Sequence, residues 1–255
     1  MLPRKSADYR TILWVLAMPI VALVQYRNPG LIKWMWPLSC YFALAAGVIA
    51  HNHNHFQTFK NKRLNAIFAN WISIFYGYPT FAWVPTHNLN HHKYVNKAGD
   101  ATITWRHSNS QNALVAITYF FVSSYYQAGP IKEYIRKARA SNPKLYRTIV
   151  TQYAVFWGTH AMLLAMAIAW HGPVRGLYVY GLTFAVPAFF ALWTIMFFNY
   201  GQHVHTDPWS RHNHSRTFNG KILNFLLFNN GLHAAHHENA GTHWSDLPEV
   251  HAELA

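Results

Sequence analysis

Charged residues are scarce in this sequence of 255 residues. They make up 11% of the chain, and only eight are acidic, against 21 lysines and arginines. Soluble globular domains contain about 25% charged residues, so the composition argues against an ordinary soluble domain. The chain also has a single cysteine, Cys40, which excludes an internal disulfide and a metal site built from several thiolates.

The shortage of acids also limits the kind of metal centre that the chain could hold. Di-iron sites in ferritin-like helical bundles take Glu from four helices, two of them in Glu-x-x-His pairs. No Glu-x-x-His occurs in this sequence, whereas there are 18 histidines. A metal centre in this chain would therefore be held mainly by imidazole.

Long apolar runs are present, and four of them predict membrane-spanning helices. The second run has 20 residues and would form a helix about 30 Å long, the thickness of the hydrocarbon core. A turn at Asn28, Pro29 and Gly30 joins the first two runs, which indicates a helical hairpin rather than a signal peptide. Two weaker stretches, 64–84 and 113–127, are expected to form helices that lie in the membrane interface or dip partway into the membrane. The predicted spans are 11–26, 31–50, 148–170 and 176–198.

The distribution of basic residues predicts the orientation of these spans. If both termini and residues 52–147 share one side of the membrane, that side holds 18 of the 21 lysines and arginines. The positive-inside rule then places it in the cytoplasm. The formal net charge of +13 could suggest a nucleic-acid partner, but that requires a soluble basic surface, which the long apolar runs argue against, so we expect none. We expect one multi-pass, all-α integral membrane domain over residues 1–255, with four transmembrane helices and additional interfacial helices.

Eleven of the 18 histidines fall into four clusters, and nine of these are candidate ligands by their helical spacing. Residues at i, i+3 and i+4 share a helix face, so His51 should align with His55, and His87 with His91. An even number of predicted crossings separates the clusters, so all four can meet on the cytoplasmic side. Neutral imidazole offers a lone pair to a metal. The candidate ligands are His51, His55, His87, His91, His92, His203, His233, His236 and His237.

The other histidines are weaker candidates. His53 lies off the face shared by His51 and His55 and is expected to support a ligand or face solvent. His205 and His243 are left open between a metal role, a supporting role and neither. Ordinary surface or core positions are expected for His107, His160, His171, His212, His214 and His251.

These motifs resemble the three histidine boxes of the membrane fatty acid desaturase superfamily, which also contains alkane and lipid hydroxylases. The boxes read His51-x3-His55, His87-x3-His91-His92 and His233-x2-His236-His237. Flanking residues are similar as well, including Tyr94, Asn96 and Asp100 after the second box and Leu247-Pro248-x-x-His251 after the third. The resemblance covers about residues 47–251.

The resemblance implies two iron ions held by the nine candidate histidines, with Asn199 approaching a metal through water. It also implies O2, a lipid or fatty acyl substrate, and an external electron donor of the ferredoxin, rubredoxin or cytochrome b5 type. We expect no catalytic residue beyond the metal site itself. At least one of the acids near the boxes should accept a hydrogen bond from a ligand imidazole; these are Asp100, Asp207, Glu238 and Asp246.

The sequence leaves the reaction open. Loss of two hydrogens would give a double bond, whereas oxygen insertion would give an alcohol. The Asn199-Tyr-x-x-His203 string and the spacing of the second box also resemble the hydroxylase branch. The first box has Asn52 where desaturases often carry an acid. A zinc-dependent membrane hydrolase is a more distant alternative, because imidazole also suits zinc. A metal transporter or sensor is disfavoured, since only His160 lies inside a predicted span.

Two further segments carry functional hypotheses. Residues 131–147 hold six basic residues and a single acid, Glu133, and could bind anionic lipids, an acidic electron donor or an acidic substrate headgroup. Aromatic residues of the stretch 71–83 either line a groove for an acyl chain or anchor an interfacial helix; they are Trp71, Phe75, Tyr76, Tyr78, Phe81 and Trp83.

Overall fold

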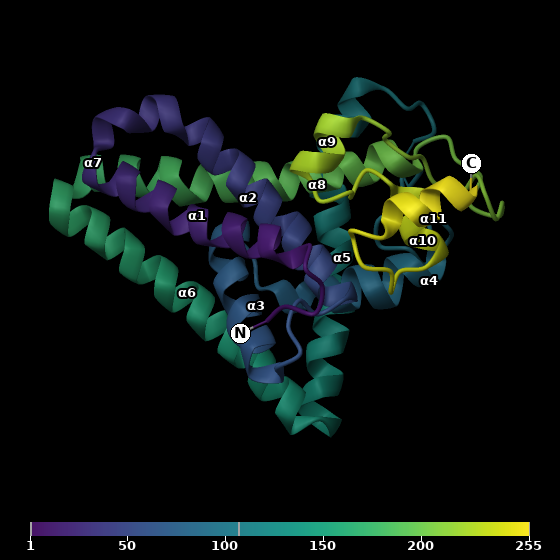
Figure 1. Ribbon diagram of the computed structural model, residues 1–255, viewed down its shortest axis with the longest axis horizontal. Helices are drawn as coiled ribbons and strands as arrows, with labels where there is room; N and C mark the ends of the chain where they lie inside the picture. Colours follow the sequence, from purple (N-terminus) through teal and green to yellow (C-terminus); the bar gives the residue numbers. More distant parts are fainter. Residues whose placement is uncertain (1, 107, 255) are drawn as a thin grey trace. The chain divides into compact units, whose positions relative to one another are not determined.

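A computed structural model describes residues 2–106 and 108–254, so His107 lies outside the described residues. All the named elements of the described part are helices, which confirms the all-α prediction (Figure 1). The α-helices are α1 (Asp8–Arg27), α2 (Ile32–His55), α3 (Lys62–Tyr76), α4 (His92–Tyr94), α5 (Ala113–Ser141), α6 (Pro143–His171), α7 (Pro173–Tyr180), α8 (Val186–His203), α9 (Lys221–Leu226), α10 (His233–Glu238) and α11 (Leu247–Leu254). Two 3-10 helices, η1 (Pro29–Leu31) and η2 (Thr80–Ala82), and two π-helices, η3 (Val84–His91) and η4 (Gly181–Ala185), complete the order.

Four continuous helical segments of the described chain are long and apolar enough to cross a membrane. They are Asp8–Arg27, Pro29–His55, Pro143–His171 and Pro173–His203. Each contains one of the predicted spans and extends beyond it. The extensions at the ends of α2 and α8 are polar turns that stay helical, and they carry His51, His55 and His203. The histidines therefore sit on rigid continuations of apolar helices.

The chain divides into two compact units, each built from separate segments. The first unit runs from the N-terminus to His53 and adds Gln57–Phe81 and Arg147–Leu192. The second unit contains Asn54–Phe56, Ala82–Tyr146 and Trp193–Ala255. The expectation of a single membrane domain stays a prediction.

In the first unit, α1 and α2 form the predicted hairpin through η1. The Gln25 amide donates to the Ser39 hydroxyl (2.6 Å), and the Trp14 indole N–H donates to the Tyr41 hydroxyl (2.6 Å), so two hydrogen bonds join α1 to α2. The core of this unit gathers side chains from several helices, namely Tyr26, Ile32, Ile74, Ala167, Val179 and Phe184.

Two glycines permit close packing in this unit. Gly77 ends α3 with φ of 92°, a left-handed conformation that glycine adopts without strain. A Cβ at Gly77 would also lie 2.3 Å from the Cβ of Ala188. Gly176 on α7 packs against the backbone of α6, where a Cβ would lie 2.5 Å from the Cα of Ile168. Larger residues at either position would force the helices apart.

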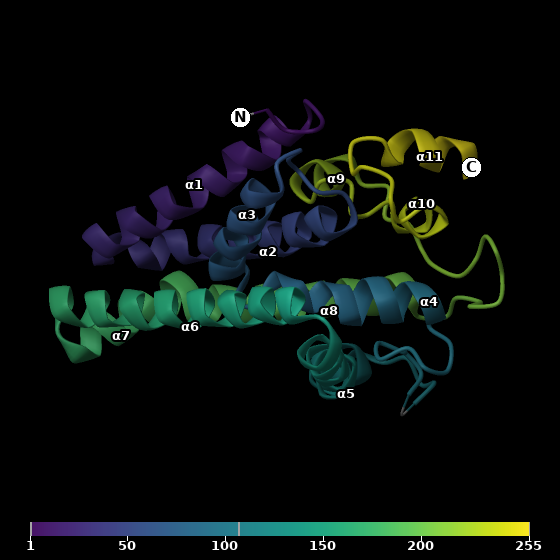
Figure 2. The ribbon, with the colours of Figure 1, turned by 90° about the horizontal axis from the view of Figure 1, so that it is seen from below.

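In the second unit, α5 packs against η3, which carries His87 and His91 of the second histidine box. Tyr119, Tyr200 and Val204 form one buried cluster, and Leu232, Ala235 and Leu247 form another that holds α10 against α11. Both ribbon views place α10 beside α11 (Figures 1 and 2). Helix α5 has 29 residues, more than the stretch predicted for it. The interfacial placement of α3 and α5 stays a prediction.

Candidate metal centre

The second histidine box folds as the π-helix η3 followed directly by α4. A π-helix bonds residue i to residue i+5 and has more residues per turn than an α-helix. This wider turn brings His92 close to His87, five residues earlier, and their Nε2 atoms lie 3.0 Å apart. The rings of His87 and His91 stack side by side with centroids 5.3 Å apart, as their spacing predicts, but their ligand atoms belong to different groups of potential ligands.

The first group of potential ligands, within the second unit, contains His55, His87 and His236, whose ligand atoms lie within 4.8 Å of one another. His92 joins them, since its Nε2 is 3.0 Å from the Nε2 of both His87 and His236. The imidazole of His55 packs edge-on against the same rings, with its centroid 4.6 Å from that of His236. Three of these four side chains come from the second and third boxes.

His51 precedes His55 by one helical turn on α2, the register in which two side chains share a face. Its Nδ1 contacts the Oδ1 of Asn52 at 3.0 Å. An amide oxygen accepts a hydrogen bond but cannot donate one, so Nδ1 carries the proton and Nε2 carries the lone pair. The neutral amide of Asn52 thus supplies an acceptor at the position where desaturases often carry an acid.

The second group consists of His91, His203, His233 and His237, again with ligand atoms within 4.8 Å of one another. The Nε2 atoms of His233 and His203 lie 2.8 Å apart, and those of His237 and His233 lie 3.0 Å apart. His233 and His237 are four residues apart on α10, whereas His236 on the same helix turns to the first group. Burial and the neighbouring His233 hold the pKa of His237 well below its ordinary value, so its imidazole is neutral and able to bind a metal.

The nitrogen spacings fit ions that are bound between the rings. Adjacent ligands with metal–nitrogen bonds of about 2.0–2.1 Å lie about 2.9–3.4 Å from one another in octahedral or tetrahedral geometry. The measured Nε2 separations in the two groups are 2.8–3.5 Å. One shared proton can satisfy one such pair, but it cannot satisfy a triangle such as His87, His92 and His236. A cation can satisfy all three lone pairs at once.

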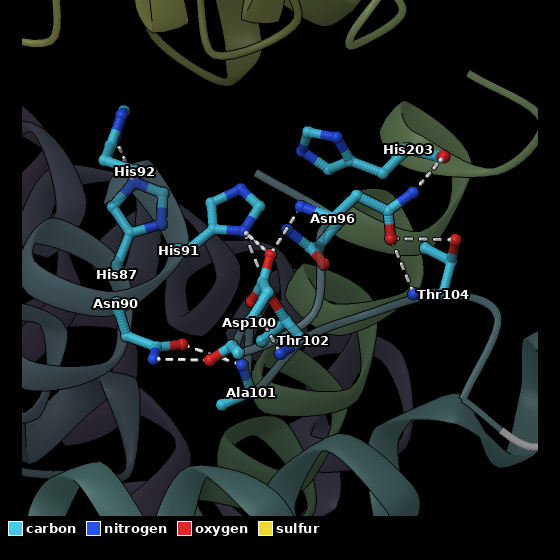
Figure 3. Close-up of polar contacts among 12 residues, drawn as sticks. His87, Asn90, His91, His92, Asn96, Asp100, Ala101, Thr102, Thr104 and His203 are labelled. Carbon is cyan, nitrogen blue, oxygen red and sulfur yellow. Dashed lines mark hydrogen bonds and ion pairs between the residues drawn. The ribbon is translucent and has the colours of Figure 1, made fainter. Parts of the chain in front are cut away.

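Asp100 orients one potential ligand directly. Its Oδ2 lies 2.8 Å from Nδ1 of His91, and both side chains are buried (Figure 3). Burial alone would raise the pKa of Asp100, but the adjacent His91 and hydrogen bonds from Thr102 and the Asn96 N–H outweigh it and hold that pKa well below its usual range. Asp100 is therefore a carboxylate that accepts from His91 Nδ1, as predicted for at least one of the four acids. Carboxylate–imidazole pairs of this kind are typical of metal-bound histidine.

The other ring nitrogen of His91, Nε2, lacks a hydrogen-bond partner among the described residues. Because Nδ1 donates to Asp100, Nε2 holds the lone pair. This atom is buried, and no hydrogen-bond partner reaches it among the described residues. An unmet buried polar atom costs about 1–3 kcal/mol. His203 has the same tautomer, because its Nδ1 faces the carbonyl oxygen of His214 at 3.2 Å and must donate to it. Its Nε2 therefore holds the lone pair. The residues present thus fit a metal.

A strained loop holds Asp100 in place. Val95 and Asn96 have φ of 38° and 60°, and Gly99 has φ of 103°. The Asn96 N–H donates to Asp100 (2.7 Å), while its side-chain oxygen accepts from the Thr104 N–H (2.8 Å) and its amide donates to the His203 carbonyl (3.0 Å). Figure 3 shows Asn96 between the Asp100 loop and the end of α8. Sequence reasoning missed this role of Asn96, although its match to the family pattern was a signal.

Asn199 takes part in the same network. Its Oδ1 accepts from the buried hydroxyl of Tyr119 at 2.8 Å, and that hydroxyl also contacts the Thr102 carbonyl oxygen. The other three acids contact other groups: Asp207 accepts from the Trp209 N–H, Glu238 pairs with Arg211, and Asp246 accepts from Ser245. Sequence reasoning gave no sign of Tyr119, whose link to the site depends on the folding of the loop.

The remaining histidines of the described chain lie outside both groups. His53 contacts the Thr58 hydroxyl through Nδ1 at 3.0 Å, and His243 contacts the Ser245 hydroxyl at 2.8 Å and packs on Phe56. His205 is exposed with φ of 54°. His214 lies closer to the second group than predicted, because the centroid of its ring is 5.4 Å from that of His237.

Comparison with known proteins identifies the family of the chain. The family model for fatty acid desaturase matches residues 30–255, so the chain belongs to this family, as its histidine boxes predicted. No curated protein and no solved structure matches the chain.

Proposed function

We propose that this protein is a membrane-bound oxidoreductase that binds two iron ions and uses O2 to introduce a double bond into a fatty acyl or lipid chain. Membership of the fatty acid desaturase family supports the reaction class. The observation that carries the proposal is the buried, unmet Nε2 of His91 between Asp100 and three other imidazoles.

In this proposal the first iron is held by His51, His55, His87, His92 and His236, and the second by His91, His203, His233 and His237. Asn199 approaches a metal through water. When bound, iron and O2 supply the oxidising power to attack an unactivated C–H bond. The protein keeps three of the nine ligand rings in one tautomer: Asn52, Asp100 and the His214 carbonyl hold the Nδ1 protons of His51, His91 and His203. Each Nε2 lone pair then faces inward without a competing proton.

Burial of the candidate ligands is the protein's second contribution. His91 and His203 are 1% and 0% exposed, so water has little access to this part of the site. Exclusion of water protects reactive intermediates and strengthens electrostatic interactions. By the positive-inside rule, we place the site and both termini on the cytoplasmic side.

A hydroxylase on the same scaffold is the second candidate, because the Asn199–His203 string and the second box also resemble the hydroxylase branch. Mass spectrometry of lipids from cells that express the protein separates the two. We expect a product two hydrogens lighter than the substrate, present with the wild type and absent with His91→Ala. A product heavier by one oxygen would establish the hydroxylase instead. Near-stoichiometric zinc without iron, in protein from iron-replete cells, would favour the hydrolase.

A further inference from the structure

The hydroxyl of Tyr119 contacts two segments, the loop around Asp100 and helix α8, that hold potential ligands of the second group. It lies 2.8 Å from the Oδ1 of Asn199 on α8, and it also contacts the carbonyl oxygen of Thr102. Asn199 precedes His203 by one helical turn, the register in which two side chains share a face. Tyr119 is 3% exposed, so water has little access to these contacts.

The loop on one side of Tyr119 is firmly fixed. The backbone N–H and the hydroxyl of Thr102 both donate to Oδ1 of Asp100, each at 2.7 Å. The other carboxylate oxygen of Asp100 accepts from His91 (Figure 3). Thr102 therefore provides its carbonyl oxygen as a rigid anchor, and the Tyr119 hydroxyl is held against it.

On the other side of Tyr119, the contact fixes the orientation of a side-chain amide. Tyr119 holds the Asn199 amide by its oxygen, and no partner among the described residues reaches the NH2 group. A phenol hydroxyl both donates and accepts, so exchange of the two ends of the amide would keep the contact. The NH2 group would then donate to Tyr119, and the Tyr119 proton would be left for the Thr102 carbonyl. In either orientation the plane of the amide is fixed and only one of its ends stays available.

We propose that Tyr119 is a positioning residue for the second metal position, because its hydroxyl fixes the amide of Asn199 against the Thr102 carbonyl. This inference rests on the proposed function, in which Asn199 approaches a metal through water. Tyr119 acts through Asn199 and not by its own contact with a metal. An amide that is already oriented loses little conformational entropy when it engages such a water.

A purely structural role for Tyr119 is the competing explanation, and Tyr200 provides its control. The two rings pack together with centroids 5.1 Å apart, and both belong to the buried cluster that includes Val204. The Tyr200 hydroxyl donates to Gln111 at 2.7 Å. Tyr200→Phe therefore removes a hydroxyl from the same cluster and leaves the contacts of the Tyr119 hydroxyl in place, which makes it the matched control for Tyr119→Phe.

Cobalt binding tests the proposal without turnover. The full-length protein, in nanodiscs of phosphatidylcholine, is stripped of metal and titrated with Co²⁺ against a chelator of known affinity. The binding step that His203→Ala abolishes reports the second group. For this step we expect Tyr119→Phe and Asn199→Ala each to raise Kd about 10-fold, since partners that orient ligands typically contribute about 10–100-fold to metal affinity. Tyr200→Phe should leave Kd within about twofold.

The double variant Tyr119→Phe/Asn199→Ala separates positioning from packing. If the hydroxyl acts through Asn199, its removal has little further effect once the amide is gone, so Kd should stay within about threefold of that of Asn199→Ala. Independent effects would instead multiply to about 100-fold. The visible absorption of bound Co²⁺ depends on its coordination. We expect Tyr119→Phe to shift this spectrum in the same direction as Asn199→Ala, and Tyr200→Phe to keep that of the wild type.

Several results would overturn the positioning role while the protein still binds two ions. They are an unchanged Kd in Tyr119→Phe, an equal loss in Tyr200→Phe, or multiplied losses in the double variant. Metal-free Tyr119→Phe that does not fold, or that unfolds well below metal-free Tyr200→Phe, would establish the structural role instead. A wild type that binds no metal would contradict the proposed function itself, and the role of Tyr119 with it.

Discussion

Buried histidines in the two compact units differ in what their ring nitrogens face. In the first unit, His160 contacts the Tyr180 hydroxyl at 3.0 Å and the Ile74 carbonyl at 3.1 Å, so both of its nitrogens have protein partners. In the second unit, the nitrogens of His87, His92 and His236 face one another. Burial alone therefore does not identify a potential metal ligand, whereas the convergence of several imidazole nitrogens does.

The largest effect should come from removing a convergent imidazole. We expect His91→Ala and His236→Ala each to lose iron and abolish product formation while the protein still inserts into the membrane. His236→Ala tests the first group, and His91→Ala tests the second. Iron per chain by elemental analysis and lipid mass spectrometry measure the result, with membrane extraction as the control for insertion. Retained turnover in either variant would contradict the ligand assignment.

Metal removal should affect the stability of the second unit strongly, because its buried nitrogens repel one another's lone pairs without a cation. A ligand that binds only the folded state stabilises it by about 2.7 kcal/mol at 100 times its Kd. We expect chelation to lower the unfolding temperature and two equivalents of Fe²⁺ per chain to restore it. The His91→Ala variant is the control and should respond less. A chelator that changes neither unfolding temperature nor metal content would show that no ion contributes to the fold.

Asp100→Asn should weaken the site without destroying it. The substitution keeps the shape of the side chain but removes the charge that holds the His91 tautomer. Loss of a carboxylate behind a ligand histidine typically costs 10–100-fold in metal affinity or activity. Competition with a chelator of known affinity measures the change. An affinity equal to that of the wild type would mean that Asp100 serves only the loop.

The sequence predicted the helical class, four spans and the histidine boxes, because apolar length and imidazole spacing are local properties. It did not predict which histidine joins which group. That assignment depends on the folded π-helix η3, where His87 and His91 stack side by side while their ligand atoms belong to different groups. The roles of Asn96 and Tyr119 were equally hidden, since both depend on a loop with left-handed residues that only the folded chain defines.

His160→Ala tests the comparison between the two units at the buried histidine of the first unit. Its removal leaves the Ile74 carbonyl and the Tyr180 hydroxyl without their buried partner, which typically costs about 1–3 kcal/mol. We expect a lower unfolding temperature with unchanged iron content per folded chain. His160→Gln, which can keep one hydrogen bond, should recover part of the loss. Iron loss in His160→Ala without destabilisation would break the distinction between the units.

His171→Ala should have the smallest effect of the series. The Nε2 of His171 contacts the Tyr26 carbonyl oxygen at 2.8 Å, and the side chain is only half-buried, so water can replace it as a donor. A typical intramolecular hydrogen bond contributes about 0.5–1.5 kcal/mol, and partial exposure puts this one at the low end. We expect wild-type iron content and product yield, with a shift in unfolding temperature smaller than that of His160→Ala. Loss of bound metal in this variant would overturn the proposed topology, because it would bring the far end of α6 to the metal centre.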